Sequence, residues 1–127
     1  MLAKKVLIAD DERDFVTFLS VALKREGFDV FTAFDGIEAK ERIEEDSPDI
    51  VILDLIMPHL NGWEVLKWIK EKERRIPVII LSAKDDFDDI KNTYNLNADY
   101  YMTKPVSVRD IVKGINTVSA PGTFRSL

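Results

Sequence analysis

The sequence contains no cysteine, so disulfide bonds and thiolate metal sites are excluded. It also lacks any apolar run close to the roughly 20 residues that a membrane-spanning helix needs. The residues before the first apolar run, Met1 to Lys5, are too few to form a secretory signal. A single histidine leaves no histidine cluster for a softer metal ion. These absences predict a cytoplasmic protein that does not contact a membrane.

The composition of the chain is that of an ordinary globular domain. Its 127 residues are 46% hydrophobic and 32% charged, which favours one domain with a single core. A net charge of −5 disfavours attraction to phosphate backbones, so we expect no direct nucleic-acid binding by this domain. We expect the domain to cover residues 1–119, with residues 120–127 as a flexible tail or the start of a linker.

Short apolar runs alternate with longer segments in which apolar residues recur every three or four positions. The apolar runs predict strands, and the longer segments predict helices. Because the strands are apolar throughout, both faces of their sheet are expected to be covered, which is typical of a parallel sheet in an α/β fold. The helix predicted over 85–95 has a thin apolar face of Phe87, Ile90 and Tyr94. The predicted strands lie at residues 6–9, 30–33, 50–54, 78–81 and 100–102.

Polar residues stand where these apolar runs end. Asp10 and Asp11 follow the first run, and Asp54 closes the third. Ser82 follows the fourth, and Lys104 comes shortly after the last. In an open α/β sheet the functional crevice lies outside the carboxyl ends of the strands. We therefore expect these residues to meet at one edge of the sheet.

Together these side chains predict phosphoryl-transfer chemistry. Carboxylates crowded at one place repel one another, and Mg²⁺, which prefers oxygen ligands, would relieve that repulsion. With the metal present, Asp54 could attack phosphorus and become an acyl phosphate. Lys104 would neutralise charge on the phosphoryl oxygens, and Ser82 would hydrogen-bond one of them.

The chain resembles the receiver domains of bacterial two-component response regulators, of the chemotaxis-regulator type. The resemblance runs from about Lys4 to Val118, and it implies a single-domain flavodoxin-like fold with strand order 2-1-3-4-5. The motifs that carry it are, in chain order, Asp10-Asp11-Glu12, Asp54-x-x-Met57-Pro58-x-x-x-Gly62, Ser82-Ala83 and Tyr101-x-x-Lys104-Pro105.

The resemblance implies a role for each of these residues. Asp54 would accept a phosphoryl group from a histidine kinase or phosphotransfer protein, in phosphorelay signal transduction. Mg²⁺ would be held by the side chains of Asp11 and Asp54, by Asp10 largely through water, and by the backbone carbonyl of Ile56. Such a protein is a regulator rather than a conventional enzyme, since it catalyses only its own phosphorylation and slow autodephosphorylation.

The family resemblance also predicts how a signal would leave the site. Ser82 would move towards the phosphoryl group, and Tyr101 would follow it. Members of the family usually have a cis bond at the position of Lys104-Pro105. The output would be a downstream protein or an appended domain, and phosphorylation-dependent homodimers are compatible with the sequence.

Two positions beside the predicted phosphoryl group are expected to tune its lifetime. Ile56 is apolar where many receivers have a polar side chain, and Lys84 occupies a second variable position. Because Ile56 cannot hydrogen-bond the hydrolytic water, we expect slow dephosphorylation. The alternative function is a receiver that serves as a docking module for proteins, independently of phosphorylation.

Overall fold

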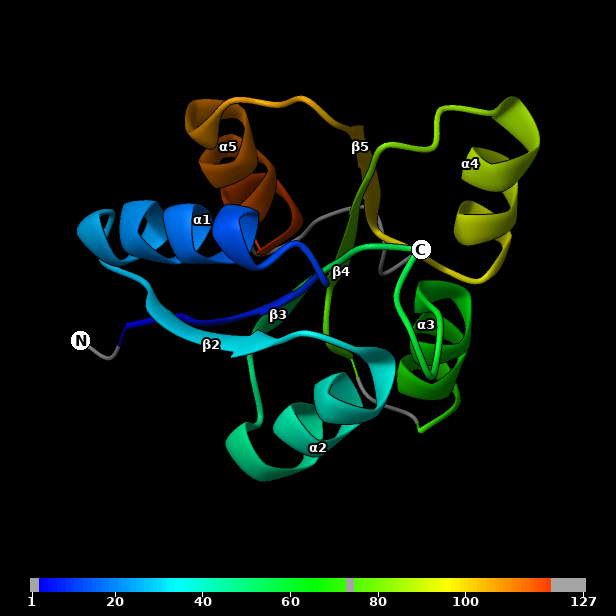
Figure 1. Ribbon diagram of the computed structural model, residues 1–127, viewed down its shortest axis with the longest axis horizontal. Coiled ribbons are helices and arrows are strands. Elements are labelled where there is room, and N and C mark those ends of the chain that lie inside the picture. The colour runs from blue at the N-terminus through cyan, green and yellow to red at the C-terminus, as the bar shows by residue number, and fades with distance from the viewer. Residues whose placement is uncertain (1–2, 73–74, 120–127) are drawn as a thin grey trace.

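The computed structural model describes residues 3–72 and 75–119, in which strands and helices alternate along the chain (Figure 1). The strands are β1 (Lys5–Ala9), β2 (Asp29–Ala33), β3 (Ile50–Leu53), β4 (Val78–Ser82) and β5 (Tyr100–Thr103). The helices are α1 (Arg13–Arg25), α2 (Gly36–Asp46), α3 (Gly62–Glu71), α4 (Phe87–Asn95) and α5 (Val108–Ser119).

The strands form one five-stranded parallel sheet in the order β2-β1-β3-β4-β5. This is the predicted flavodoxin-like order. The central strands β1, β3 and β4 are almost entirely buried, as their continuous apolar sequences predicted. β2 and β5 form the two edges of the sheet and are more exposed.

Each face of the sheet supports its own hydrophobic core, because alternate residues of a strand point to opposite faces. Leu7, Val51 and Ile80 pack with α2 and α3 on one face. Val6, Ile52 and Leu81 pack with α1 and α5 on the other. Figure 1 shows the same division, with α1 and α5 on one side of the sheet and the other three helices opposite.

Side chains at the starts of three helices bond to the first turn. The Asn61 side chain accepts a hydrogen bond from the Glu64 backbone N–H, and the Glu64 carboxylate accepts one from the Asn61 N–H. Asp35 caps α2 in a similar way. The Ser107 hydroxyl accepts a hydrogen bond from the Asp110 N–H at the start of α5. Such caps satisfy backbone donors that a helix leaves free.

Helix α4 differs from the sequence prediction in the direction of its aromatic side chains. Of the three residues of the predicted apolar face, Phe87 is 76% exposed and Tyr94 is 42% exposed, and Ile90 packs against the core. Thr93 is the buried residue of this helix, and Ile90 is half-buried. In a short helix with few apolar residues, the sequence pattern fits more than one orientation about the helix axis. The pattern alone therefore does not fix which side chains face the core.

Among the described helices, none is long and apolar enough to cross a membrane.

Candidate functional site

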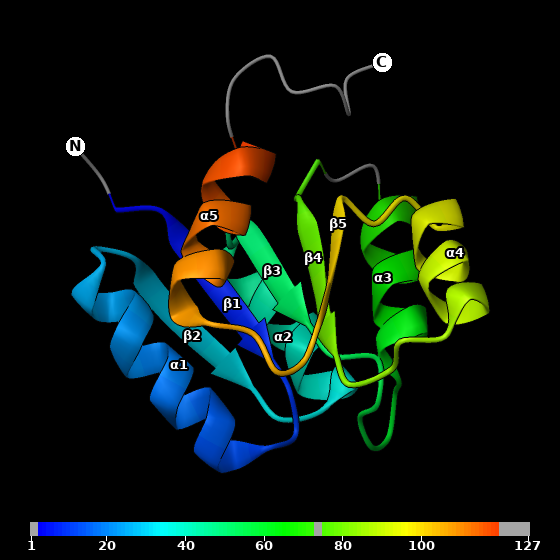
Figure 2. The same ribbon diagram turned by 90° about the horizontal axis from the view of Figure 1, so that it is seen from above.

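The carboxyl ends of the central strands lie together along one side of the sheet (Figure 2). The predicted polar residues stand at these strand ends, and this side of the sheet is called the carboxyl edge below. The Asp54 N–H donates to the Ala9 carbonyl at 2.9 Å, which continues the β1–β3 pairing to the point where Asp54 begins. The Lys104 N–H donates to the Ser82 carbonyl at 2.8 Å and extends β4–β5 pairing in the same way. Backbone hydrogen bonds of the sheet therefore hold the residues that carry the candidate chemistry.

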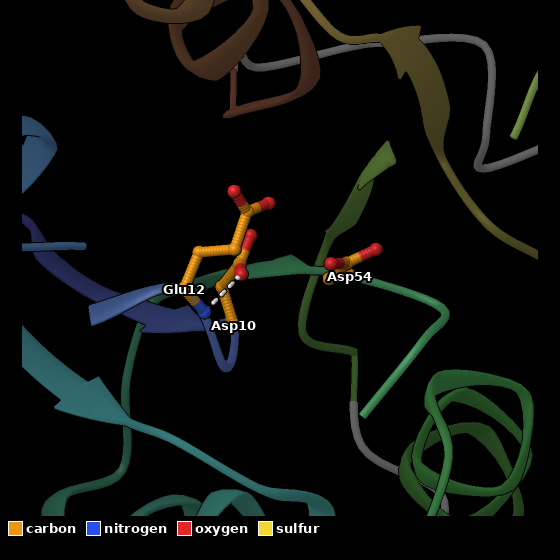
Figure 3. Close-up of side chains that lie close together, drawn as sticks. All are labelled: Asp10, Glu12 and Asp54. Carbon is orange, nitrogen blue, oxygen red and sulfur yellow. Dashed lines mark hydrogen bonds between the residues drawn. The ribbon is translucent and has the colours of Figure 1, made fainter. Parts of the chain in front are cut away.

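Three carboxylates meet at this edge. Carboxylate oxygens of Asp10, Glu12 and Asp54, one from each, all lie within 4.8 Å of one another. Figure 3 shows Asp10 and Glu12 at the end of β1 beside Asp54, which follows the neighbouring strand β3. Asp10 and Asp54 are buried, whereas the Glu12 side chain is 63% exposed. A group of oxygen donors of this kind suits Mg²⁺.

Lys104 compensates the negative charge of this carboxylate group. Its Nζ lies 2.6 Å from Asp10 Oδ2, 2.8 Å from Glu12 Oε1 and 3.6 Å from Asp54 Oδ2. Only 13% of the Lys104 side chain is exposed. Solvent therefore screens its shortest contact, the one to Asp10, very little. The Lys104–Pro105 peptide bond is cis, as expected.

The crowding of these charges changes the pKa values of two of the groups. Burial raises the pKa of the Asp10 carboxyl and the charge of Asp54 adds to the rise, which hydrogen bonds from Lys104 and the Glu12 N–H offset only in part. Burial alone would lower the pKa of the Lys104 ammonium, but its hydrogen bonds to Asp10 and Glu12 and the charges of Asp10 and Asp54 raise it overall. The site therefore attracts positive charge.

The loop after Asp54 folds back closely onto the end of β3. A Cβ atom on Gly62 would run into the Asp54 carbonyl oxygen and come within 2.6 Å of the Leu55 Cα. The Gly62 N–H donates to the Leu55 carbonyl at 2.9 Å and closes the loop. The glycine of the Asp54-to-Gly62 motif is thus explained by a close backbone approach that no side chain would permit.

Ile56 lies on the outside of this loop and is 51% exposed. Its backbone N–H points to Asp54 Oδ1, with an N–O distance of 3.4 Å. His59 is also exposed, and its Nδ1 lies 3.1 Å from Asp35 Oδ2. The only histidine of the sequence therefore pairs with the N-cap of α2.

Ser82, Lys84 and Tyr101 form a connected group beside the carboxylates. Ser82 is buried, and its Oγ accepts a hydrogen bond from the Lys84 N–H at 3.3 Å. Tyr101 is 9% exposed, and its hydroxyl donates to the Lys84 carbonyl at 2.6 Å. The Lys84 ammonium lies 3.3 Å from Asp89 of α4 and 5.9 Å from the centre of the Trp63 ring. This group links the carboxylate site to α4.

The structure brings most of the predicted residues together but arranges the acidic motif differently. Asp11 is exposed and lies outside the carboxylate group, in which Glu12 joins Asp10 instead. The sequence analysis assigned no role to Glu12. Alternation along an extended segment could have indicated it, because residues two apart then point to the same side.

Comparison with known proteins gives the same family as the motifs. Residues 6–116 match the response regulator receiver domain. The chain belongs to this family, whose members are the signal-receiving parts of two-component systems.

Among curated proteins, the chain is 41% identical over 126 residues to the alkaline phosphatase synthesis transcriptional regulatory protein PhoP of Bacillus subtilis (strain 168). The aligned part is 94% of this chain but 52% of the relative, so the chain spans about half the length of that protein.

Two solved structures show the same fold. The receiver domain of the Francisella response regulator 1452 is 34% identical, with a TM-score of 0.86 and coverage of 91% of this chain and 96% of that one. A DNA-binding response regulator of the LuxR family from Staphylococcus aureus is 30% identical, with a TM-score of 0.88 and coverage of 92% and 99%.

Proposed function

We propose that this receiver accepts a phosphoryl group on Asp54 from the phosphohistidine of a kinase or phosphotransfer protein. An oxygen of the Asp54 carboxylate forms a bond to phosphorus while the phosphorus–nitrogen bond breaks. The electron pair leaves with the imidazole nitrogen, which is protonated from solvent. The observation that carries this proposal is the Lys104 ammonium, which contacts Asp10 and Glu12 and lies 3.6 Å from Asp54.

Lys104 has the position that transition-state stabilisation requires. Negative charge on the phosphoryl oxygens would lie beside Asp54, within reach of an ammonium that the sheet edge already holds in place. A cation that is placed in advance needs little reorganisation during the reaction. Ser82 would donate its hydroxyl proton to another phosphoryl oxygen, and its Oγ accepts a hydrogen bond from the Lys84 N–H at the end of β4.

The residues at this edge fit Mg²⁺. Asp10 and Asp54, together with Glu12, offer close oxygen donors, and the family resemblance adds Asp11 and the Ile56 carbonyl. When bound, the metal would neutralise the carboxylates and the charge of the incoming phosphoryl group. Lys104 contributes positive charge beside two of the same carboxylates.

The direct experiment is incubation of the chain with acetyl phosphate and Mg²⁺, followed by intact mass measurement. We expect the mass increase of one phosphoryl group, lost on treatment with base and absent from Asp54→Asn. Peptide mapping should locate the group on Asp54. An unmodified wild-type chain would refute the proposal and favour the alternative, a docking module that acts independently of phosphorylation.

We further propose that the phosphoryl group is long-lived. Ile56 offers no side-chain hydrogen bond to a hydrolytic water, and the Lys84 ammonium is engaged by Asp89. Ile56→Asn should therefore speed dephosphorylation about three- to tenfold, since one hydrogen bond is worth about 1 kcal/mol. Ile56→Val is the matched control and should leave the rate unchanged. Equal or faster loss from the wild type than from Ile56→Asn would contradict this proposal.

The output would be the surface of α4, β5 and α5. When Ser82 turns to the phosphoryl group, Tyr101 would repack against it and shift α4 between two preexisting arrangements. The relatives named as a transcriptional regulator and as a DNA-binding regulator suggest that such a surface could control a DNA-binding domain in a longer protein. A downstream protein or a second copy of the chain would use the same surface.

A further inference from the structure

Lys104 has a neighbour that the proposed chemistry does not use. The centre of the Phe15 ring lies 4.5 Å from the Lys104 Nζ, well inside the roughly 6 Å range of a cation–π contact. Phe15 belongs to the first turn of α1, whereas Lys104 follows β5, so the contact joins opposite ends of the chain. In the sequence, Phe15 is one of several apolar residues that recur every three or four positions after Asp11.

We propose that Phe15 is a positioning residue for the phosphorylation of Asp54: its ring holds the Lys104 ammonium beside the acceptor carboxylate. This inference rests on the proposed function, since it assigns a role in the same reaction. In this proposal Phe15 acts through Lys104 and not directly on Asp54 or the phosphoryl group.

Lys104 needs such support because its side chain is long and flexible. A lysine side chain carries about 2 kcal/mol of rotamer entropy, so one contact rarely keeps its ammonium in place. Its Nζ lies closer to Asp10 and Glu12 than to Asp54. Of these partners, Glu12 is 63% exposed and holds the ammonium only weakly in water.

The Phe15 ring can provide that support because it is fixed. The residue is half-buried and packs against the core that α1 and α5 share with the sheet. A lysine that slides along a fixed ring loses the attraction of the ring face, so the contact limits how far the ammonium can move.

An aromatic ring has an advantage over a further carboxylate at this place. The ring attracts a cation through its quadrupole but carries no charge and accepts no strong hydrogen bond. It therefore does not compete with phosphoryl oxygens for the N–H donors of Lys104. Glu12 and Asp10, by contrast, must give up those donors when the phosphoryl group arrives.

The chain contains a matched control for this contact. The Arg13 guanidinium lies 4.1 Å from the centre of the Phe34 ring, and Phe34 packs against the same core as Phe15. Phe34→Leu therefore removes an equal ring from the same core and also a cation–π contact. It keeps the Phe15 ring that lies against Lys104.

The first test is the NMR chemical shift of the Lys104 ε-methylene protons in the full chain, without Mg²⁺ or phosphodonor. A ring face next to the ammonium shifts these protons upfield. We expect the shift to vanish in Phe15→Leu and to persist in Phe34→Leu. An ordinary shift in the wild type would overturn the proposal whether or not the protein can be phosphorylated.

The second test is the rate of Asp54 phosphorylation by acetyl phosphate at saturating Mg²⁺. Phe15→Leu should slow it about three- to tenfold, the range expected for one cation–π contact, while Phe34→Leu should match the wild type. Equal rates for the two variants would overturn the positioning role. A wild-type chain that is not phosphorylated at all would instead refute the proposed function itself.

A fluorination series separates attraction from packing, and it serves even if Phe15→Leu folds poorly. Phenylalanines with one, two and three ring fluorines at position 15 keep almost the same shape but weaken the ring quadrupole step by step. We expect the logarithm of the phosphorylation rate to fall in proportion to the number of fluorines. A constant rate across the series would show that Phe15 only fills space.

Discussion

The carboxylate site at the carboxyl ends of the central strands and the region of α4 and the outer strand β5 are held in different ways. Asp10 and Asp54 are buried at the ends of central strands, and the Lys104 ammonium pairs with both carboxylates. In α4, Thr93 is the single buried residue, and Phe87 at its start is 76% exposed. The comparison teaches that the proposed chemistry lies on closely packed elements, whereas α4 in the proposed output surface buries few side chains, which favours local opening there.

Lys84 makes three of the contacts that connect these two regions. Its backbone N–H donates to Ser82, its carbonyl accepts from Tyr101, and its ammonium pairs with Asp89 of α4. A change at Ser82 would therefore reach α4 through neighbours in direct contact. The following predictions test how separate the two regions are, from the largest expected effect to the smallest.

Removal of the Lys104 ammonium should have the largest effect. Lys104→Met keeps much of the side-chain length but cannot stabilise charge on the phosphoryl oxygens. Loss of one preorganised electrostatic contact typically lowers a rate by about 10²–10³. We expect this reduction in acetyl phosphate-dependent phosphorylation, while Lys91→Met on the exposed face of α4 should be unaffected. Similar rates for both variants would contradict the role of Lys104.

Replacement of glycine by alanine should destabilise the protein at Gly62, beside the carboxylate site, and stabilise it at Gly114, which lies against β5. In Gly62→Ala the new Cβ would meet the backbone of Asp54 and Leu55, and such overpacking typically costs about 1–3 kcal/mol. In Gly114→Ala on α5 the Cβ would find ordinary contacts of 3.5 Å with Met102 and Tyr100. Because alanine favours a helix over glycine, this variant should gain up to about 1 kcal/mol.

Chemical denaturation of both glycine variants measures these changes in the free energy of unfolding. Equal destabilisation would mean that the α5 side of the molecule is packed as closely as the site. A neutral Gly62→Ala would mean that the loop after Asp54 can move away from β3.

Removal of the Tyr101 hydroxyl should weaken the connection between the regions with little effect on the chemistry. Tyr101→Phe loses the 2.6 Å hydrogen bond to the Lys84 carbonyl, which should cost about 1 kcal/mol of stability. We expect near-normal phosphorylation of Asp54 but a smaller phosphorylation-induced change in hydrogen exchange along α4. A wild-type response in α4 would show that the signal takes another route.

The crowded carboxylates predict a pH-dependent stability difference. Burial and the charge of Asp54 raise the pKa of Asp10 in the folded protein. A raised folded pKa gives a stabilising contribution that is complete below the unfolded value of 3.8 and is lost as pH rises through the folded value. Without divalent cations, Asp10→Asn should therefore gain stability relative to the wild type as pH rises from acid to neutral.

Urea denaturation of both proteins at mildly acidic and at neutral pH measures this difference. A free energy of unfolding of Asp10→Asn that falls relative to that of the wild type towards neutral pH would contradict the raised pKa. Asp29→Asn, at an exposed position on β2, is the control and should show no such trend.

Local patterns in the sequence were sufficient for the sheet but not for the aromatic side chains. The continuous apolar runs of β1, β3 and β4 predicted burial on both faces, because a strand that contacts water alternates polar and apolar residues. The helical period correctly predicted that α4 is a helix, but the Phe87 and Tyr94 side chains are exposed to solvent. Which side of a short helix faces inward depends on the neighbouring elements, and those lie elsewhere in the chain.

By itself the sequence determined that Asp10, Asp54, Ser82 and Lys104 stand at the ends of strands. Parallel strands end at a common edge, so their meeting there needed no further information. Only the tertiary structure decided that Glu12 completes the carboxylate group and that Phe15 lies against Lys104. Such contacts depend on the direction of single side chains and on packing between distant segments, as in the 92-residue separation of Glu12 and Lys104. No local pattern in the chain encodes them.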